Sequence, residues 1–288
     1  MSDSRSPDAA ALIATRDLVQ TFPGGVQALR GVSLEVHGDD LLAILGPSGA
    51  GKSTLLRSLN RLIEPTGGAV LYRGRDVTRA SGGDLRRLRQ QVGMIFQQFN
   101  LVGRLTVLEN VLAGRLRFTG WPFGRLMSHV RVFGGRHREV AYAALERVGI
   151  ERQAFQRADT LSGGQQQRVA IARLLAQEPR VILADEPIAS LDPRSAAVVM
   201  ETLRVIHREE GIPVIVNLHQ IEMARRYATR IVGMHEGRLV FDGSPAALDD
   251  AAVHRIYGDQ PDAQSPVAKS ASSPAPPPEL HRPELSSS

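Results

Sequence analysis

The order of apolar and polar positions along the chain predicts strands that alternate with helices. Strands are expected where residues alternate or a short apolar run is bounded by turn residues, at Leu12–Thr21, Val26–Val36, Leu41–Leu45, Ala69–Tyr72, Val92–Phe96, Val181–Ala184, Pro213–Leu218, Ile231–Met234 and Arg238–Phe241. Helices are expected where apolar residues recur every three or four positions, at Ser53–Leu62, Asp84–Gln90, a stretch that Ser162 caps and that runs through Gln177, Arg194–Arg208 and Pro245–Tyr257. This alternation is typical of an α/β fold.

The stretch from about Leu105 to Asp159 interrupts the alternation. Two apolar helical faces occur there, made by Val107, Leu108, Val111 and Leu112 and by Val140, Ala144, Leu145 and Val148. A Gly- and Arg-rich segment with the only tryptophan, Trp121, separates them. We therefore predict a helical subdomain at about 105–160. Residues 1–11 are polar and 259–288 are rich in Pro, Ser and Ala, so both are expected to be disordered around one folded domain, 12–258.

Composition excludes several classes of protein. No apolar run approaches the roughly 20 residues of a membrane helix, and the N-terminus has no signal-peptide hydrophobic region. The chain has no cysteine, which excludes a disulfide framework and fits a cytosolic protein. The net charge of +5 could favour nucleic acid or an anionic membrane surface, but an excess this small is better interpreted as surface solvation.

One glycine-rich stretch, GPSGAGKST, matches the phosphate-binding loop G-x-x-x-x-G-K-[ST]. It lies between a predicted buried strand and a predicted helix, which is the context that the motif requires. Its glycines allow a tight turn with inward N–H groups, and the helix start adds its positive dipole end. We expect ATP to bind at Gly46, Pro47, Ser48, Gly49, Ala50, Gly51, Lys52, Ser53 and Thr54.

Within this loop, Lys52 would reach the β- and γ-phosphates and the Ser53 hydroxyl would bind Mg²⁺. The chain has only two lysines, Lys52 and Lys269, among 35 lysine and arginine residues. Lysine is thus kept where a compact ammonium on a thin stem must pass between phosphates, a role for which a planar guanidinium is poorly shaped.

A pair of acidic residues, Asp185 and Glu186, follows the predicted buried strand Val181–Ala184. Burying a carboxylate costs free energy, so two of them at the end of a buried strand indicate a functional role. Asp185 suits a Mg²⁺ ligand, and Glu186 suits a general base acting on the attacking water.

Three further features each have a structural alternative. The glycines after Ser162 form either a helix cap or a second phosphate site. Gln97 and His219 each end a predicted strand, where a polar residue is usually structural. Phe22 either stacks on a base or closes the first hairpin.

The order of these motifs resembles the ATP-binding-cassette (ABC) family over roughly Ile13 to Tyr257. It comprises the phosphate loop, a glutamine after a strand, LSGGQ, an apolar strand with Asp-Glu, Ser-Leu-Asp, and a histidine after a strand. The resemblance implies an ABC ATPase fold: a RecA-like P-loop ATPase core with an antiparallel β-subdomain and an inserted α-helical subdomain. It also implies ATP and Mg²⁺ as cofactors.

The resemblance also implies roles for single residues. Phe22 looks like the aromatic that stacks on adenine, where the family often has Tyr. Gln97 looks like a Mg²⁺ ligand that senses the γ-phosphate, and His219 like the histidine that contacts it. Asp192 looks like the residue that couples the two sites of a dimer. The signature loop, which in this family caps ATP held by the opposite subunit, corresponds to Leu161, Ser162, Gly163, Gly164 and Gln165.

Several stretches resemble the ATPases of phosphonate importers: Arg157–Arg173, Val214–Gly233 and Leu112–Leu116. This resemblance implies a homodimer at the cytoplasmic face of the bacterial inner membrane, a permease partner, and an extracytoplasmic phosphonate-binding protein. The alternatives are an accessory ATPase of phosphonate degradation and an importer of another small anion or amino acid. A cassette ATPase acting on nucleic acid is disfavoured because a single cassette without a long coiled coil is present.

Overall fold

A six-stranded sheet forms the centre of the computed structural model, which describes residues 11–118 and 133–258. Its strands lie in the order β10 (Arg238–Gly243), β9 (Arg230–His235), β3 (Leu41–Leu45), β8 (Val214–Asn217), β7 (Val181–Ala184) and β6 (Val92–Ile95). All neighbours are parallel except β10, which is antiparallel to β9. The parallel strands therefore end at one common edge, where the acidic pair and the phosphate loop begin.

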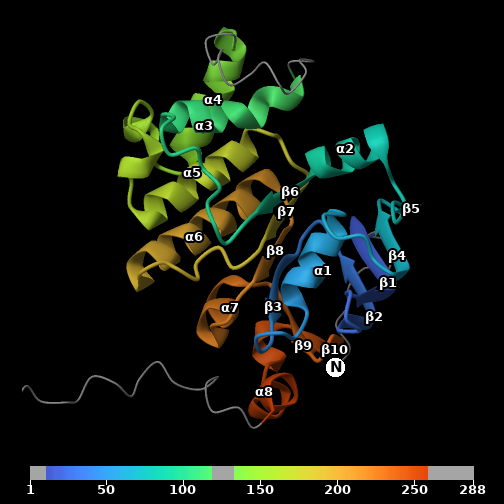
Figure 1. The fold of residues 1–288 in the computed structure, drawn as a ribbon. Helices are drawn as coiled ribbons and strands as arrows, with labels where there is room; N and C mark the ends of the chain where they lie inside the picture. The colour runs from blue at the N-terminus through green and yellow to red at the C-terminus, as the bar shows by residue number, and fades with distance from the viewer. Residues whose placement is uncertain (1–10, 119–132, 259–288) are drawn as a thin grey trace, which may run out of the picture.

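A second, antiparallel sheet lies beside the first (Figure 1). Its order is β2 (Gln27–Val36), β1 (Ile13–Thr21), β4 (Gly67–Tyr72) and β5 (Arg75–Asp76). Register shifts in β1 between Thr15 and Leu18 mark an irregularity, and Asp17 there has a φ of 43°. The expected antiparallel β-subdomain is thus present.

Two hydrophobic cores lie on opposite faces of the parallel sheet. Successive side chains of β3 point to alternate faces: Leu42 and Ile44 pack with helix α1 (Lys52–Leu59) and the antiparallel sheet. Leu41, Ala43 and Leu45 pack on the other face, in the core that every later helix except α2 (Gly82–Gln91) covers, whereas Leu88 of α2 packs in the same core as α1. Because β3 is buried on both faces, its sequence is a continuous apolar run.

Three helices in the core around Leu41, Ala43 and Leu45 contact one another: α3 (Val107–Leu112), α4 (Gly135–Arg147) and α5 (Gly163–Leu175). They form the group at the upper left of Figure 1. The chain further contains α2 (Gly82–Gln91), α6 (Pro193–Glu210), α7 (Ile221–Tyr227) and α8 (Asp250–Tyr257), with 3-10 turns at Ala113–Phe118, Glu151–Gln153, Ala158–Thr160 and Pro245–Ala247. The bounds of the predicted helical subdomain, about 105–160, remain a prediction.

Most predicted elements agree with the structure to within two residues, and the differences have local causes. Helix α1 ends at Leu59 rather than Leu62, because Arg61 has a left-handed φ of 59° and Leu62 is left exposed. The helix expected over Pro245–Tyr257 is two pieces, since the Asp249 side chain caps a new start at α8. The strand β5 and the helix α7 were not predicted.

The faces of the helical group also match in large part. All four expected residues of α3 are buried, whereas in α4 Ala141 takes the place expected for Val140. Trp121, the segment 1–10 and the tail 259–288 lie outside the described residues, so the disorder expected at both ends stays a prediction.

Candidate nucleotide-binding site

The phosphate loop joins β3 to α1 and requires glycine at two close approaches. Gly46 has a φ of 152°, and a Cβ there would lie 2.3 Å from the Met234 carbonyl oxygen. Gly51 has a φ of 99°, and its Cβ would lie 2.4 Å from the Ala28 carbonyl oxygen. Backbone from β9 and β2 therefore closes around the loop, and no side chain would fit at either position.

Lys52 lies across the loop. Its Nζ donates to the carbonyl oxygens of Gly46 at 2.6 Å and Pro47 at 3.0 Å, and the residue is 4% exposed. Burial lowers the pKa of Lys52, while the charges of Glu186 and Asp185 oppose part of that shift. The ammonium thus spans the turn that phosphates would occupy, and Ser48 and Gly49 are exposed at its tip.

Asp185 follows β7 and is 2% exposed. Its Oδ1 accepts the Ser53 hydroxyl at 2.7 Å and the Asn217 amide at 2.8 Å. Its Oδ2 accepts Nε of Arg57 at 3.1 Å and lies 2.9 Å from the Nη2 of the same guanidinium. The structure therefore brings two of the three expected magnesium residues, Ser53 and Asp185, into direct contact.

Glu186 and His219 meet across the ends of neighbouring strands. Because Ala184 of β7 pairs with Val216 of β8, the residues after both strands lie at the same edge. The Nε2 of His219 is 2.8 Å from Oε1 of Glu186, and the two side chains are 43% and 20% exposed. Glu186 has a left-handed φ of 51°, a strained conformation of the kind found at functional sites.

Neither Gln97 nor Phe22 makes a side-chain hydrogen bond to this group within the described residues. Gln97 is exposed just beyond β6, whose neighbour β7 precedes Asp185, and no hydrogen bond within the described residues joins it to the site. Phe22 is half-buried at the first hairpin, where its N–H donates to the Val26 carbonyl at 2.9 Å. Closure of the hairpin and stacking on a base are both compatible with this position.

The signature loop forms a complete helix cap. The Ser162 hydroxyl accepts the Gln165 N–H, and the Gln165 side chain accepts the Ser162 N–H at 2.9 Å. Leu161 is buried in the core, while Ser162 is exposed. In the described part of the chain, no hydrogen bond joins this loop to the phosphate loop of the same subunit.

Asp192 caps α6, which starts beside the signature loop. Its Oδ1 accepts the N–H groups of Arg194 and Ser195, and the hydrogen bonds from Ser195 hold the pKa of Asp192 below its usual range. A Cβ on Gly164 would lie 2.7 Å from the Ser195 side chain. The tight contact places the start of α6, which Asp192 caps, against the start of α5.

Two residues at the site were not predicted as functional. Asn217 closes β8, and a polar residue there is usually only a strand end; Arg57 lies one turn after Ser53 on α1. The signal that could have found Arg57 is its i, i+4 relation to Ser53, which puts both side chains on one face of the helix.

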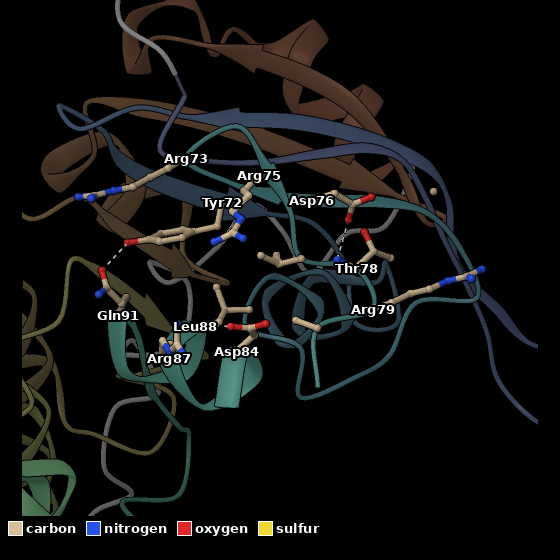
Figure 2. Close-up of a pocket in the computed structure, with 13 residues that line it drawn as sticks. Tyr72, Arg73, Arg75, Asp76, Thr78, Arg79, Asp84, Arg87, Leu88 and Gln91 are labelled. Carbon is tan, nitrogen blue, oxygen red and sulfur yellow. Dashed lines mark hydrogen bonds and ion pairs between the residues drawn. The ribbon is translucent and has the colours of Figure 1, made fainter. Parts of the chain in front are cut away.

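A groove of about 840 Å³ lies away from the phosphate loop, between the β4–β5 hairpin and α2 (Figure 2). Four arginines line it, Arg73, Arg75, Arg79 and Arg87. Arg73 and Arg79 point to opposite ends, so the four guanidinium groups do not converge on one position. The groove therefore has positive charge but no assembled anion site.

The site combines a glycine-rich turn, a buried lysine, and a serine that contacts a carboxylate at the ends of parallel strands. These features define the protein as a P-loop nucleotide-binding ATPase. Residues 29–189 match the family described as "ABC transporter". The chain belongs to this family.

Relatives cover most of this chain. "Phosphonates import ATP-binding protein PhnC" of Bacillus anthracis is 49% identical, with 86% of this chain and 95% of the relative covered. A protein of the same name from Thiobacillus denitrificans is 51% identical, with 85% and 92% covered.

Among solved structures, cbiO1 of Clostridium perfringens, part of the ABC transporter complex cbiONQ, is 30% identical with a TM-score of 0.72. The match covers 85% of this chain and 94% of the cbiO1 chain. The dimeric cassette MJ0796 with ADP and Pi is 33% identical with a TM-score of 0.70, covering 81% and 98%. The predicted ABC ATPase fold is confirmed.

Proposed function

We propose that the protein is the ATP-hydrolysing subunit of a phosphonate importer, which works as a homodimer and energises a separate membrane permease. The observation that carries the ATPase is the cluster of Lys52, Ser53, Asp185, Glu186 and His219 at one edge of the parallel sheet. The observation that supports phosphonate as cargo is the name shared by relatives at about half sequence identity.

The donor set fits Mg²⁺, which would neutralise phosphate charge when bound with ATP. A hydroxyl and a carboxylate are the oxygen ligands that Mg²⁺ prefers, and it commonly takes one or two carboxylates plus substrate phosphates. Ser53 and Asp185 would hold it, and Gln97 would reach it from β6. The described residues contain no group of three or more His, Cys, Asp or Glu that could hold a metal ion without the nucleotide.

The remaining residues would have separate roles in ATP binding and hydrolysis. The phosphate loop, Gly46 to Thr54, would bind the phosphates through N–H groups and Lys52, and Phe22 would stack on the base. Glu186 would take a proton from the attacking water. His219, which now lies 2.8 Å from Glu186, would hold that carboxylate and contact the γ-phosphate.

The signature loop would act on ATP held by a second subunit. Its Ser162 is exposed and its backbone N–H groups begin α5, so the loop offers anion-binding donors outward. Leu161 would support the loop from the core, Gly163, Gly164 and Gln165 would form its face, and Asp192 at the start of α6 would link the two sites.

Coupling to transport requires partners outside this chain. No helix in the described ranges is long and apolar enough to cross a membrane. We place the protein peripherally at the cytoplasmic face of the bacterial inner membrane, bound to permease subunits that receive cargo from an extracytoplasmic phosphonate-binding protein. Nucleic acid is not among the proposed partners.

The test is uptake. Cells that lack this gene should lose growth on a phosphonate as sole phosphorus source, and a plasmid copy should restore it while a Lys52→Ala copy does not. Normal growth on inorganic phosphate is the control. Unimpaired phosphonate uptake with blocked use of the imported phosphonate would instead favour an accessory ATPase of phosphonate degradation.

A further inference from the structure

Asp185 has a different set of partners on each carboxylate oxygen. On Oδ2, Arg57 provides two contacts from one guanidinium, at 3.1 Å through Nε and 2.9 Å through Nη2. On Oδ1, the Asn217 amide and the Ser53 hydroxyl donate at 2.8 Å and 2.7 Å. The carboxylate is therefore fixed in rotation as well as in position.

The two extra partners come from the elements that enclose the site. Arg57 lies one helical turn after Ser53 on α1, so the same helix face that carries the hydroxyl also carries the guanidinium. Asn217 ends β8, the neighbour of β7, and is fully buried. These supports reach Asp185 from two sides, and in the described residues neither side chain has a hydrogen bond to the phosphate loop.

Burial explains why such support is needed. Asp185 is 2% exposed, and a buried carboxylate is costly unless it is paired and hydrogen-bonded. A two-point guanidinium contact supplies the charge and a fixed plane, whereas a lysine ammonium would supply only a point charge. The Arg57 side chain is 44% exposed, so part of its guanidinium stays hydrated. Pairing with Asp185 therefore adds little desolvation cost for the arginine charge.

We propose that Arg57 and Asn217 are positioning residues that fix the rotation of Asp185, so that its Oδ1 faces Ser53 and is presented to Mg²⁺. This proposal rests on the proposed function of the site. Arg57 takes Oδ2 and Asn217 takes one position on Oδ1. Mg²⁺ would take the position on Oδ1 that the Ser53 hydroxyl now occupies, so the guanidinium does not compete with the metal.

The experiment measures the magnesium dependence of nucleotide binding in the purified full-length chain. A fluorescent ATP analogue is titrated in EDTA and then over a range of MgCl₂ concentrations. Variants are Arg57→Ala, Arg57→Lys and Asn217→Leu, with Arg87→Ala as an arginine control on α2, where Arg87 pairs with Asp84.

Arg57→Ala should raise the MgCl₂ concentration for half-maximal effect by about tenfold to a hundredfold, the range expected for hydrogen bonds to a charged group. Affinity in EDTA should stay within about twofold of the parent, because the phosphate loop is untouched. Arg57→Lys should recover only part of the loss. Asn217→Leu should shift the same MgCl₂ dependence, and Arg87→Ala should not.

The outcomes separate this proposal from the function on which it rests. If no form binds the analogue either in EDTA or at any MgCl₂ concentration, the nucleotide site itself is wrong. If the parent binds with a magnesium effect and Arg57→Ala shows an unchanged or a lower half-maximal MgCl₂ concentration, positioning by Arg57 is refuted. A full recovery by Arg57→Lys would show that charge, not orientation, is what Asp185 requires.

Discussion

Replacing Glu186 by glutamine isolates the proton-accepting role of its carboxylate. Glutamine has nearly the same shape and can keep a hydrogen bond with His219, whose Nε2 lies 2.8 Å from Oε1 in the parent. The left-handed φ of 51° at this position is a backbone property that the substitution retains. The fold and ATP binding should therefore survive.

The expected loss follows from the role. General-base catalysis contributes about 10²–10⁴-fold in rate. At about 1.36 kcal/mol per factor of ten, this equals about 2.7–5.4 kcal/mol of activation free energy. Removing the carboxylate also removes repulsion against the γ-phosphate, so ATP should stay bound between two subunits.

Two measurements test this together: phosphate release under saturating ATP, and size-exclusion chromatography with and without ATP. Glu186→Gln should lose at least about 99% of the rate and elute as an ATP-dependent dimer. The matched control is Glu201→Gln on α6, which pairs with Arg204 on the surface and should behave as the parent. A variant that keeps most of its rate, or that binds ATP yet remains monomeric, would refute the reasoning.

Three further predictions follow from single features. Lys52→Ala should abolish ATP binding or hydrolysis while leaving the circular dichroism spectrum unchanged, since the Nζ donates to carbonyl oxygens of the loop itself; unchanged ATPase activity would contradict its role. Arg230→Ala removes the guanidinium from Asp40, which is 1% exposed, and should lower the free energy of unfolding by about 3–5 kcal/mol in urea denaturation; a loss below about 1 kcal/mol would count against it. Truncation after Tyr257 should leave ATPase activity and melting temperature nearly unchanged, because the following segment has few apolar residues, and a clear fall in melting temperature would show that it docks.

The segment after Gln97 shows how packing alters a sequence-based interpretation. The resemblance to the ABC family implies that Phe99, Leu101 and Val102 line a groove for a permease helix, and packing within the helical subdomain is the alternative. Leu101 packs against the helical core, and Arg173 donates to the carbonyl oxygens of Phe99 and Asn100. Packing is thus favoured for Leu101, and Leu101→Asp should lower the melting temperature as well as uptake, which makes it a poor test of coupling alone.

The strands and the acidic pair could be predicted because each depends on local sequence. Five consecutive apolar residues predict β3, and Asp185 and Glu186 directly follow such a run. The order of strands could not be predicted, because side-chain periodicity gives the faces of a strand but not its neighbours. The support of Asp185 by Asn217 depends on that order, since it needs β8 beside β7.

The exposure of individual site residues also could not be predicted from the local sequence pattern. Leu161 and Ser162 are consecutive in sequence, yet one is buried and one exposed, because the helix cap turns the chain there. Sequence pattern does not choose between hairpin closure and base stacking for Phe22, and its half-buried position in the structure is compatible with both.

The place of β3 in the sheet has a consequence for synthesis of the protein on the ribosome. Its two neighbours, β8 and β9, are formed by residues 214–217 and 230–235, and the Gly237 N–H donates to the Ala50 carbonyl of the phosphate loop at 3.1 Å. A nascent chain that has just emerged through α1 therefore carries the whole glycine motif but has both edges of β3 unpaired. Such long-range closure is slow and leaves apolar strands open to aggregation. Nucleotide binding by ribosome-held fragments should begin only once the last hairpin, near Gly237, has left the exit tunnel.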